Sequence, residues 1–280
     1  MLVTPRRLVA CALVAGALTA GAACLDPIAP PRPPAPPTPS SPSGLAMPVG
    51  DLPGWHQVFA DDFVRSVPVG RFPAAVADTW WAYPDGWPDT TGKGTYMPSK
   101  VVSFANGMMD LRLHTEHGVA MVAAPVPRVP GAPGPDGGLL YGRYAVRFRA
   151  DPVPCYKTAW LLWPDSEIWP RDGEIDFPEG RLTGTISAFL HRQGAVSGSD
   201  QDAFDVPATY AQWHTAVIEW TPTMTRFLLD GETVGTSTSR IPNTPMHWVL
   251  QTETGTDGCV PPASAVGHVQ IDWVTVSTRR

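Results

Sequence analysis

Most of this chain alternates short apolar segments with turn residues. The segments are rich in Val, Ile, Thr and aromatic residues, which favour β-strands, and clusters of Gly, Pro, Asn and Asp separate them. No stretch shows a long helical period. The clearest segments are residues 101–104, 144–148, 185–190, 215–220, 226–229 and 269–276. Many short strands with regular turns predict an all-β fold, a two-sheet antiparallel β-sandwich of the jelly-roll type.

The amino-terminal residues follow a different pattern. Arg6 and Arg7 precede an apolar run over residues 8–23, and no acidic residue occurs before Asp26. A basic start followed by an apolar run predicts a signal peptide over residues 1–23. The run is short for a membrane-spanning helix, which needs about 20 apolar residues. The chain is therefore expected to be secreted or held at the outer face of the cell membrane.

The end of the predicted signal peptide allows two kinds of processing. Ala20-Gly21-Ala22 fits a cleavage site of small residues. Cys24 resembles the lipid-attachment cysteine of a lipoprotein, although Gly21 stands where a branched aliphatic residue is usual. A lipid on Cys24 would tether the protein to the membrane, and both alternatives stay open.

Residues 24–48 are rich in Pro, Ala and Ser. Such a segment cannot bury a core and favours an extended polyproline II form. At ~3.1 Å per residue, residues 26–48 would reach about 70 Å, which suits a spacer between a membrane or wall and a folded domain. Residues 49–280 are then expected to form one domain with a single core.

Three carboxylates fall within six residues at Glu174, Asp176 and Glu179. Alternation along a strand places Glu174 and Asp176 on one face, and one β-bulge would bring Glu179 to the same face. Pro178 supports a bulge, because proline has no N–H for a strand ladder. The two glutamates could then approach the ~5–5.5 Å separation of the carboxyl groups in retaining glycosidases.

The alternative for these carboxylates is an ordinary solvated strand face. Like charges on one strand face repel, however, and a fold that needs only stability would neutralise them. Trp160, Trp163 and Trp169 also precede the acids closely. Aromatic faces beside carboxylates suit sugar rings, whose C–H faces are apolar and whose hydroxyls need polar partners. The pattern favours a catalytic cleft for a glycan.

At this point the chain resembles glycoside hydrolase family 16, in the laminarinase-like form with a bulged Glu-x-Asp-x-x-Glu strand. Glu174-Ile175-Asp176-Phe177-Pro178-Glu179 matches that signature. Five further segments follow the order of the family. They are residues 54–63 (GWHQVFADDF), 104–111 (FANGMMDL), 141–147 (YGRYAVR), 213–222 with Asp230-Gly231, and 271–276 (IDWVTV).

The resemblance implies a role for each acid. Glu174 would be the nucleophile, Asp176 the assisting carboxylate and Glu179 the acid/base. Two departures from the family leave the acids intact and concern glycan specificity. Pro178 stands where an aliphatic residue or methionine is frequent, and Gly180-Arg181 follows the last glutamate where an aromatic is expected.

Several further residues are candidates for substrate contact. Trp163, Trp169 and His191 are expected near the scissile bond, and His191 could equally be a core histidine. The wider set adds Trp160, Trp81, Tyr96 and Glu253. The acidic balance, a formal net charge of −6, tilts the expectation toward neutral glycans. Because the chain has no basic stripe, no nucleic-acid partner is expected.

The remaining candidates concern a metal and the cysteines. The resemblance implies a structural calcium away from the cleft, with Asp272 and the backbone oxygen near Gly107 as ligands. Asp272 could instead accept a hydrogen bond. No cofactor is expected for catalysis. Cys155 and Cys259 form an even pair for a disulfide in an oxidising compartment, or else two buried thiols.

These features together predict a retaining endo-β-glycanase acting on β-1,3- or mixed-linkage β-glucan. The chain is expected to act as a monomer on a polysaccharide. A glycan-binding module without catalysis, a structural envelope protein and a transglycosylase with the same residues are the alternatives. A binding module has no need for a glutamate pair at this spacing, and excluding water is what would distinguish the transglycosylase.

Overall fold

Residues 41–132 and 137–280 are described by a computed structural model. The predicted signal peptide, Cys24 and residues 24–40 of the predicted linker lie outside this part of the chain. The described part of the chain contains only short helices. They are the four-residue α1 (Pro98–Val101) and the three-residue 3₁₀ helix η1 (Ala74–Val76). Among the described residues, no helix has the length and apolar character needed to cross a membrane.

The strands form two main sheets and a small ribbon. The larger sheet contains β1 (Trp55–Asp61), β3 (Gly94–Tyr96), β4 (Val102–Ala105), β5 (Met108–Glu116), β6 (Val119–Val122), β8 (Gly142–Ala150), β13 (His214–Trp220), β14 (Thr225–Leu229), β15 (Glu232–Ser237) and β17 (Val266–Arg279). The second sheet contains β9 (Tyr156–Pro164), β10 (Glu174–Arg181), β11 (Thr185–His191), β12 (Gln201–Thr209) and β16 (Met246–Thr254). The ribbon pairs β2 (Trp80–Ala82) with β7 (Pro125–Pro127).

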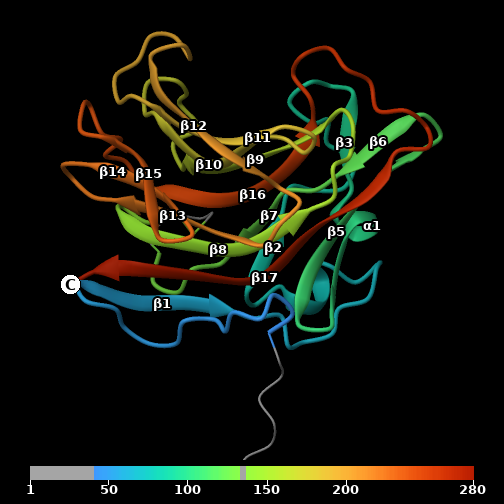
Figure 1. Cartoon of the computed structure of the whole chain (residues 1–280), viewed down its shortest axis with the longest axis horizontal. Helices are drawn as coiled ribbons and strands as arrows, with labels where there is room; N and C mark the ends of the chain where they lie inside the picture. Colours follow the sequence, from blue (N-terminus) through green and yellow to red (C-terminus); the bar gives the residue numbers. More distant parts are fainter. Residues whose placement is uncertain (1–40, 133–136) are drawn as a thin grey trace, which may run out of the picture. The chain divides into compact units, whose positions relative to one another are not determined.

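The order of the strands explains how the chain builds two layers. The larger sheet runs β15-β14-β13-β8-β17-β5-β6-β3, with β1 against β17 and β4 against β5, and the second runs β12-β11-β10-β9-β16. The pairings are antiparallel except for β3 with β6. Figure 1 shows the two sheets stacked face to face. The all-β sandwich predicted from the sequence is therefore confirmed.

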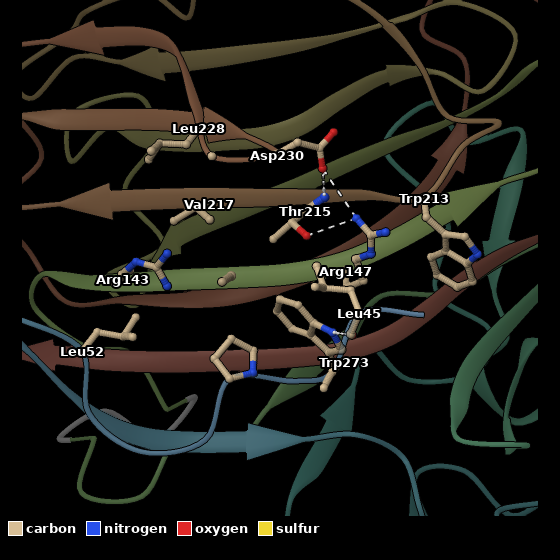
Figure 2. Close-up of a pocket in the computed structure, with 14 residues that line it drawn as sticks. Leu45, Leu52, Arg143, Arg147, Trp213, Thr215, Val217, Leu228, Asp230 and Trp273 are labelled. Carbon is tan, nitrogen blue, oxygen red and sulfur yellow. Dashed lines mark hydrogen bonds and ion pairs between the residues drawn. The ribbon is translucent and has the colours of Figure 1, made fainter. Parts of the chain in front are cut away.

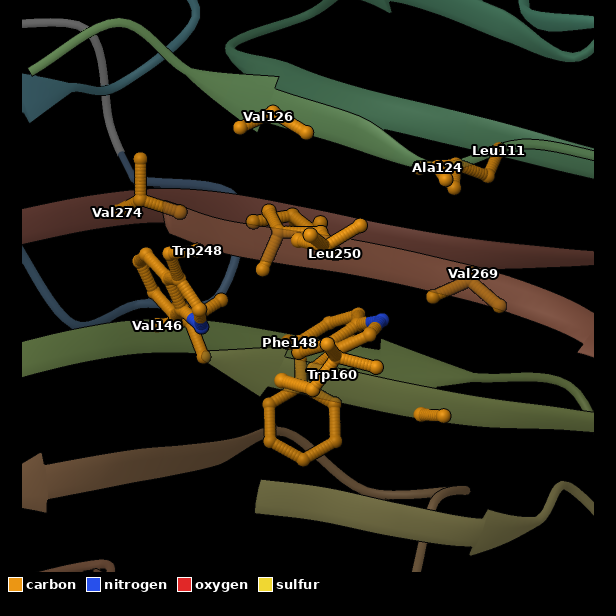
Figure 3. Close-up of a cluster of buried hydrophobic side chains, with 14 of the residues drawn as sticks. Leu111, Ala124, Val126, Val146, Phe148, Trp160, Trp248, Leu250, Val269 and Val274 are labelled. Carbon is orange, nitrogen blue, oxygen red and sulfur yellow. The ribbon is translucent and has the colours of Figure 1, made fainter. Parts of the chain in front are cut away.

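Alternating side chains of the two sheets interlock to form the core. Figure 3 shows Phe148 of β8 beside Trp160 of β9, with Trp248 of β16 nearby. The Phe148 and Trp160 rings meet edge to face with centroids 5.1 Å apart. Aromatic side chains bury large apolar areas, so this layer anchors the second sheet firmly against the first. The other face of the second sheet is free to carry polar chemistry.

The folded unit begins earlier than the sequence indicates. Residues 41–48, predicted as part of the linker, lie against the outer face of the larger sheet. The Ser41 hydroxyl donates to Asp272 Oδ2, and the Trp273 indole N–H donates to the Leu45 carbonyl over 2.9 Å. Figure 2 shows Leu45 next to Trp273, and Arg147 with Thr215 and Asp230 on the same face. Specific partners for Ser41 and Leu45, rather than composition, fix these residues in place.

Candidate active site

The acidic strand β10 carries the predicted bulge. Glu174 and Asp176 pair in register with His191 and Phe189 of β11, but Glu179 pairs with Ser187. The register to β9 shifts over the same residues. The extra residue lies in the Phe177–Pro178 segment, whose peptide bond is cis. Glu174, Asp176 and Glu179 therefore all line one cleft of about 880 Å³.

Glu174 and Asp176 form the buried floor of this cleft. Burial is the main cause that raises the pKa of Glu174 to about 7; a hydrogen bond with Asp176 opposes the rise, and the charge of Glu179 adds to it. Asp176 is 2% exposed. Burial, followed by the charges of Glu174 and Glu179, raises the pKa of Asp176 well above its usual range. The floor therefore retains a proton near neutral pH.

His191 faces both acids from the neighbouring strand. Its Nε2 atom lies 3.8 Å from Glu174 Oε2 and 3.6 Å from Asp176 Oδ2. Its Nδ1–H donates to the Gly198 carbonyl over 2.8 Å, because a carbonyl can only accept. Burial lowers the pKa of His191, although the Gly198 bond opposes this. The neutral ring therefore directs the Nε2 lone pair at the acids and at any sugar hydroxyl bound there.

Glu179 has a cationic partner that the sequence reasoning missed. Lys157 of β9 donates from Nζ to Glu179 Oε1 over 2.6 Å, and the same Nζ lies 3.3 Å from Glu253 Oε1 of β16. Counting back in twos from Trp163 places Lys157 on the cleft face of β9. A single charge within the run Tyr156-Lys157-Thr158-Ala159-Trp160 was the available signal.

Tryptophans form the walls of the cleft. The rings of Trp163 and Trp169 stack with an interplanar angle of 18° and centroids 6.3 Å apart. Trp163 donates its indole N–H to Glu167 over 2.9 Å, and Trp169 meets His191 edge to face. Trp169 is 41% exposed, which leaves surface for a sugar ring. This side of the cleft thus joins the acids to an aromatic platform.

A second group of side chains closes the other side. Trp81 of β2 packs near His247 of β16, whose ring is fixed by Asp165 at 2.8 Å. The Tyr96 hydroxyl donates to Gln251 over 2.9 Å. Trp81 and Tyr96 come from the neighbouring strands β2 and β3, whereas His247 and Gln251 come from β16, far along the chain. Strand alternation on β16 places His247, Gln251 and Glu253 on one face, and sequence reasoning singled out only Glu253.

The predicted sugar contacts divide into two groups. Those that line the cleft are Trp81, Tyr96, Trp163, Trp169, His191 and Glu253. Trp160 is the exception and the prediction was wrong there. It is fully buried against Phe148 in the core, because it lies an odd number of residues from Trp163 and so points through the sheet.

The remaining predicted residues lie away from the cleft. Cys155 and Cys259 are joined in a disulfide, one of the two arrangements that the sequence allows. Asp272 Oδ2 accepts hydrogen bonds from the Ser41 hydroxyl and the Ser43 N–H. Gly107 lies beside Pro42 of the same segment. Among the described residues, one group of three acidic or histidine side chains has its ligand atoms within 4.8 Å of one another, as a metal ion would need, and it is Glu174, Asp176 and His191.

Comparison with known proteins gives consistent matches. The model of glycosyl hydrolases family 16 matches residues 136–275. A β-glucanase of Rhodothermus marinus is 32% identical over 106 residues, which cover 32% of this chain and 35% of that protein. The chain therefore spans about a third of the length of this curated relative.

Solved structures share the fold. The non-specific endo-β-1,3(4)-glucanase SCLam superposes with a TM-score of 0.67 at 19% identity, over 84% of this chain and 95% of that one. The laminarinase of Rhodothermus marinus gives 0.64 at 21% identity, over 81% and 98%. An endo-acting O-glycanase from the human gut microbiota gives 0.64 at 19% identity, over 83% and 94%.

Proposed function

The chain belongs to glycosyl hydrolases family 16, and on that premise we propose that it is a retaining endo-β-glucanase for β-1,3- or mixed β-1,3/1,4-linked glucan. The observation that carries the proposal is the bulged strand β10. It presents Glu174, Asp176 and Glu179 to one cleft, beside the stacked Trp163 and Trp169. Relatives described as β-glucanase, laminarinase and endo-β-1,3(4)-glucanase support the choice of glycan.

The reaction follows from the positions of the acids. Ionised Glu174 attacks the anomeric carbon while Glu179 gives its proton to the leaving oxygen. Glu179 then takes a proton from water as the water breaks the bond between sugar and Glu174. Asp176 holds a proton beside Glu174 and donates it in a hydrogen bond that steadies the nucleophile. Each step moves one negative charge between Glu174 and Glu179, so the net charge of the site is conserved.

Release of products from a glycan panel tests the function. We expect oligosaccharides from laminarin or lichenan, and none from xyloglucan, agarose, carrageenan or arabinogalactan. Glu174→Ala is the matched control and should release nothing. NMR of the first product should show the β-anomer, as retention requires. Retention of the protein on insoluble glycan without turnover would instead indicate a binding module, and products extended by an acceptor sugar would indicate a transglycosylase.

We propose that the protein is exported and acts outside the cell as a monomer, tethered through a lipid on Cys24. The Cys155–Cys259 disulfide supports an oxidising compartment. Cell fractionation with and without Cys24→Ala tests the tether. The unsubstituted protein should sediment with membranes and the variant should be soluble in the medium. Equal distribution of the two would exclude lipid attachment at Cys24.

We also propose a structural calcium at the corner formed by Asp272, Gly107 and residues 41–43. Carboxylate and carbonyl oxygens suit calcium, and both Asp272 and Gly107 lie beside this segment. Asp272 Oδ2 accepts hydrogen bonds from Ser41 and Ser43, and a bound calcium would take an oxygen of the same carboxylate. After bound calcium is removed with a chelator, adding calcium back should raise the unfolding temperature of the protein. Asp272→Asn should abolish this rise and leave glucan hydrolysis intact.

A further inference from the structure

Lys157 lies between two glutamates that come from the strands on either side of it. Its Nζ atom contacts Glu179 on β10 at 2.6 Å and Glu253 on β16 at 3.3 Å. Lys157 and Glu253 are both largely buried. Lysine is seldom buried without a partner, because removing its charge from water is costly. The three side chains thus form one bridged cluster, with a single ammonium group for two carboxylates.

The two carboxylates compete for that ammonium group. Burial alone would lower the pKa of Lys157, but the charges of Glu179 and Glu253 outweigh it and raise the pKa. Burial raises the pKa of Glu253, and Lys157 partly offsets this. Lys157 therefore stays charged throughout the pH range of catalysis. How strongly it stabilises ionised Glu179 depends on how much of its charge Glu253 neutralises.

One further cation lies beside the cluster, Arg181 of β10, the register partner of Lys157, but its guanidinium pairs with Asp257 at 2.6 Å. The other titratable groups facing the cluster from each neighbouring element are Glu174 and Asp176 of β10, His191 of β11, Tyr96 of β3, Tyr210 after β12 and Asp89 before β3. These groups are acidic or neutral, and His191 is kept neutral by burial. Among the described residues, Lys157 is thus the cation that forms an ion pair with Glu179, while Arg181 is paired with Asp257.

The proposed reaction makes opposite demands on Glu179. Glu179 must carry a proton to release the first product, and it must be ionised to deprotonate the water. When Glu179 gives its proton to the leaving oxygen, its charge changes from 0 to −1 as Glu174 changes from −1 to 0 on bonding to the sugar. If Lys157 acted on Glu179 alone at 2.6 Å, its charge would favour the ionised form of Glu179 before the first step, when Glu179 must still carry a proton. With no ammonium, the ionised form needed for the second step would lack a partner.

We propose that Lys157 and Glu253 are positioning residues that set the protonation balance of Glu179. Lys157 stabilises the carboxylate formed in the first step, and Glu253 limits that stabilisation so that Glu179 can still hold a proton in the resting enzyme. The inference deepens the proposed function and rests on it. Two links hold Lys157 and Glu253 close together. The Cys155–Cys259 disulfide and the hydrogen bond from the Gly255 N–H to the Cys155 carbonyl connect the residues just before Lys157 with those just after Glu253.

The pH dependence of kcat/KM on β-glucan tests the proposal with the full chain. The basic limb reports loss of the proton from the group that acts as acid. Lys157→Met should move this limb to higher pH, by about 1 pH unit or more, because an opposite charge at this distance is removed. Glu253→Gln should move it to lower pH, since the whole ammonium charge then acts on Glu179. Lys157→Arg keeps the charge and should shift it less than Lys157→Met.

Two controls separate this role from a purely structural one. With a dinitrophenyl glycoside, whose leaving group needs no proton, neither substitution should shift the basic limb of the first step, whatever its effect on the rate. Circular dichroism at each pH checks that the variants are folded, and Glu253→Gln, which is nearly isosteric, tests the proposal even if Lys157→Met does not fold. Unchanged basic limbs, or shifts of the same sign in both variants, would overturn the proposal.

A measurement that needs no glucan cleavage can test the role of Lys157 and Glu253 separately from the proposed function. Carbon-13 NMR of labelled glutamate, assigned with Glu179→Gln, follows ionisation of the Glu179 carboxyl directly. Opposite displacements of its titration in Lys157→Met and Glu253→Gln would support the cluster even if no glucan is cleaved. Absence of glucanase activity together with those displacements would refute the substrate assignment and leave the charge relationship standing.

Discussion

Glu174 and His191 are register partners on adjacent strands, and His191 Nε2 lies 3.8 Å from Glu174 Oε2. The Gly198 carbonyl holds the other ring nitrogen as the donor, so a lone pair rather than a proton faces the acid. A charged imidazolium here would offset the repulsion between Glu174 and Asp176. Because burial keeps the ring neutral, the two acids remain crowded and retain a proton.

The two glutamates should be separable by the leaving group of the substrate. Glu174→Ala should reduce kcat on every substrate by on the order of 10⁴ or more, because no covalent intermediate can form. Glu179→Gln should lower kcat/KM on glucan by roughly 10²–10⁴ and affect a dinitrophenyl glycoside much less. Steady-state kinetics on both substrates measures this. Equal losses on both substrates in Glu179→Gln would contradict its role as the acid.

Activity should fall on the acidic side of neutrality. Burial, the largest cause, raises the pKa of Glu174 to about 7, and the nucleophile must be ionised to attack. Below pH 7, kcat/KM should therefore drop about tenfold per pH unit. A profile measured between pH 4 and 9 locates this acidic limb. A limb near the ordinary glutamate value would show that Glu174 is not buried as the structure has it.

The free energy of unfolding should fall as the pH rises, whereas activity rises with pH. Glu174 has a folded-state pKa of about 7, above its unfolded value of 4.5, so the folded state binds the proton more tightly. Its contribution to the free energy of unfolding is fully present below pH 4.5 and is lost as the pH rises through 7. The loss is on the order of 3 kcal/mol. Chemical unfolding at pH 5 and 8, compared with Glu174→Gln, should show a smaller pH dependence in the variant.

Trp163 should contribute more to substrate binding than to folding. Trp163→Ala removes one ring of the stacked pair and should raise KM on glucan about tenfold, which corresponds to roughly 1–2 kcal/mol. Trp213→Ala is a matched control, because Trp213 lies on the outer face of the larger sheet beside Arg149. Figure 2 shows Trp213 in the pocket on that face, and Trp213→Ala should therefore leave the KM on glucan unchanged. The same rise in KM for both variants would count against a binding role for Trp163.

The disulfide should stabilise the end of the cleft that holds Lys157. Cys155 and Cys259 are 104 residues apart, and closing a long loop restricts the unfolded chain most. Cys155→Ser combined with Cys259→Ser should lower the unfolding free energy by about 2–4 kcal/mol and the melting temperature by roughly 5–15 °C. Scanning calorimetry with and without reductant measures this, and the double variant should no longer respond to reductant.

Several features of this protein follow from local sequence. The short strands, the bulge on β10 and the shared face of Glu174 and Asp176 depend on period-2 alternation and on Pro178, which act between neighbours in the chain. The same alternation, applied to β9, would have assigned Trp160 to the core and Lys157 to the cleft. Trp160 was predicted to contact sugar because three tryptophans lie close together in the sequence. The face of the strand on which each residue lies was not considered, and Lys157 was missed for the same reason.

Only the tertiary structure decided which distant residues meet. The contact of Lys157 with Glu179 and Glu253 depends on the placement of β9 between β10 and β16, and β16 lies far along the chain from both. The packing of residues 41–48 depends on Asp272 and Trp273, near the carboxyl terminus. A sequence specifies alternation locally, but strand order is set by burial of the whole core. The charges that govern Glu179 therefore come from pairings that local pattern does not encode.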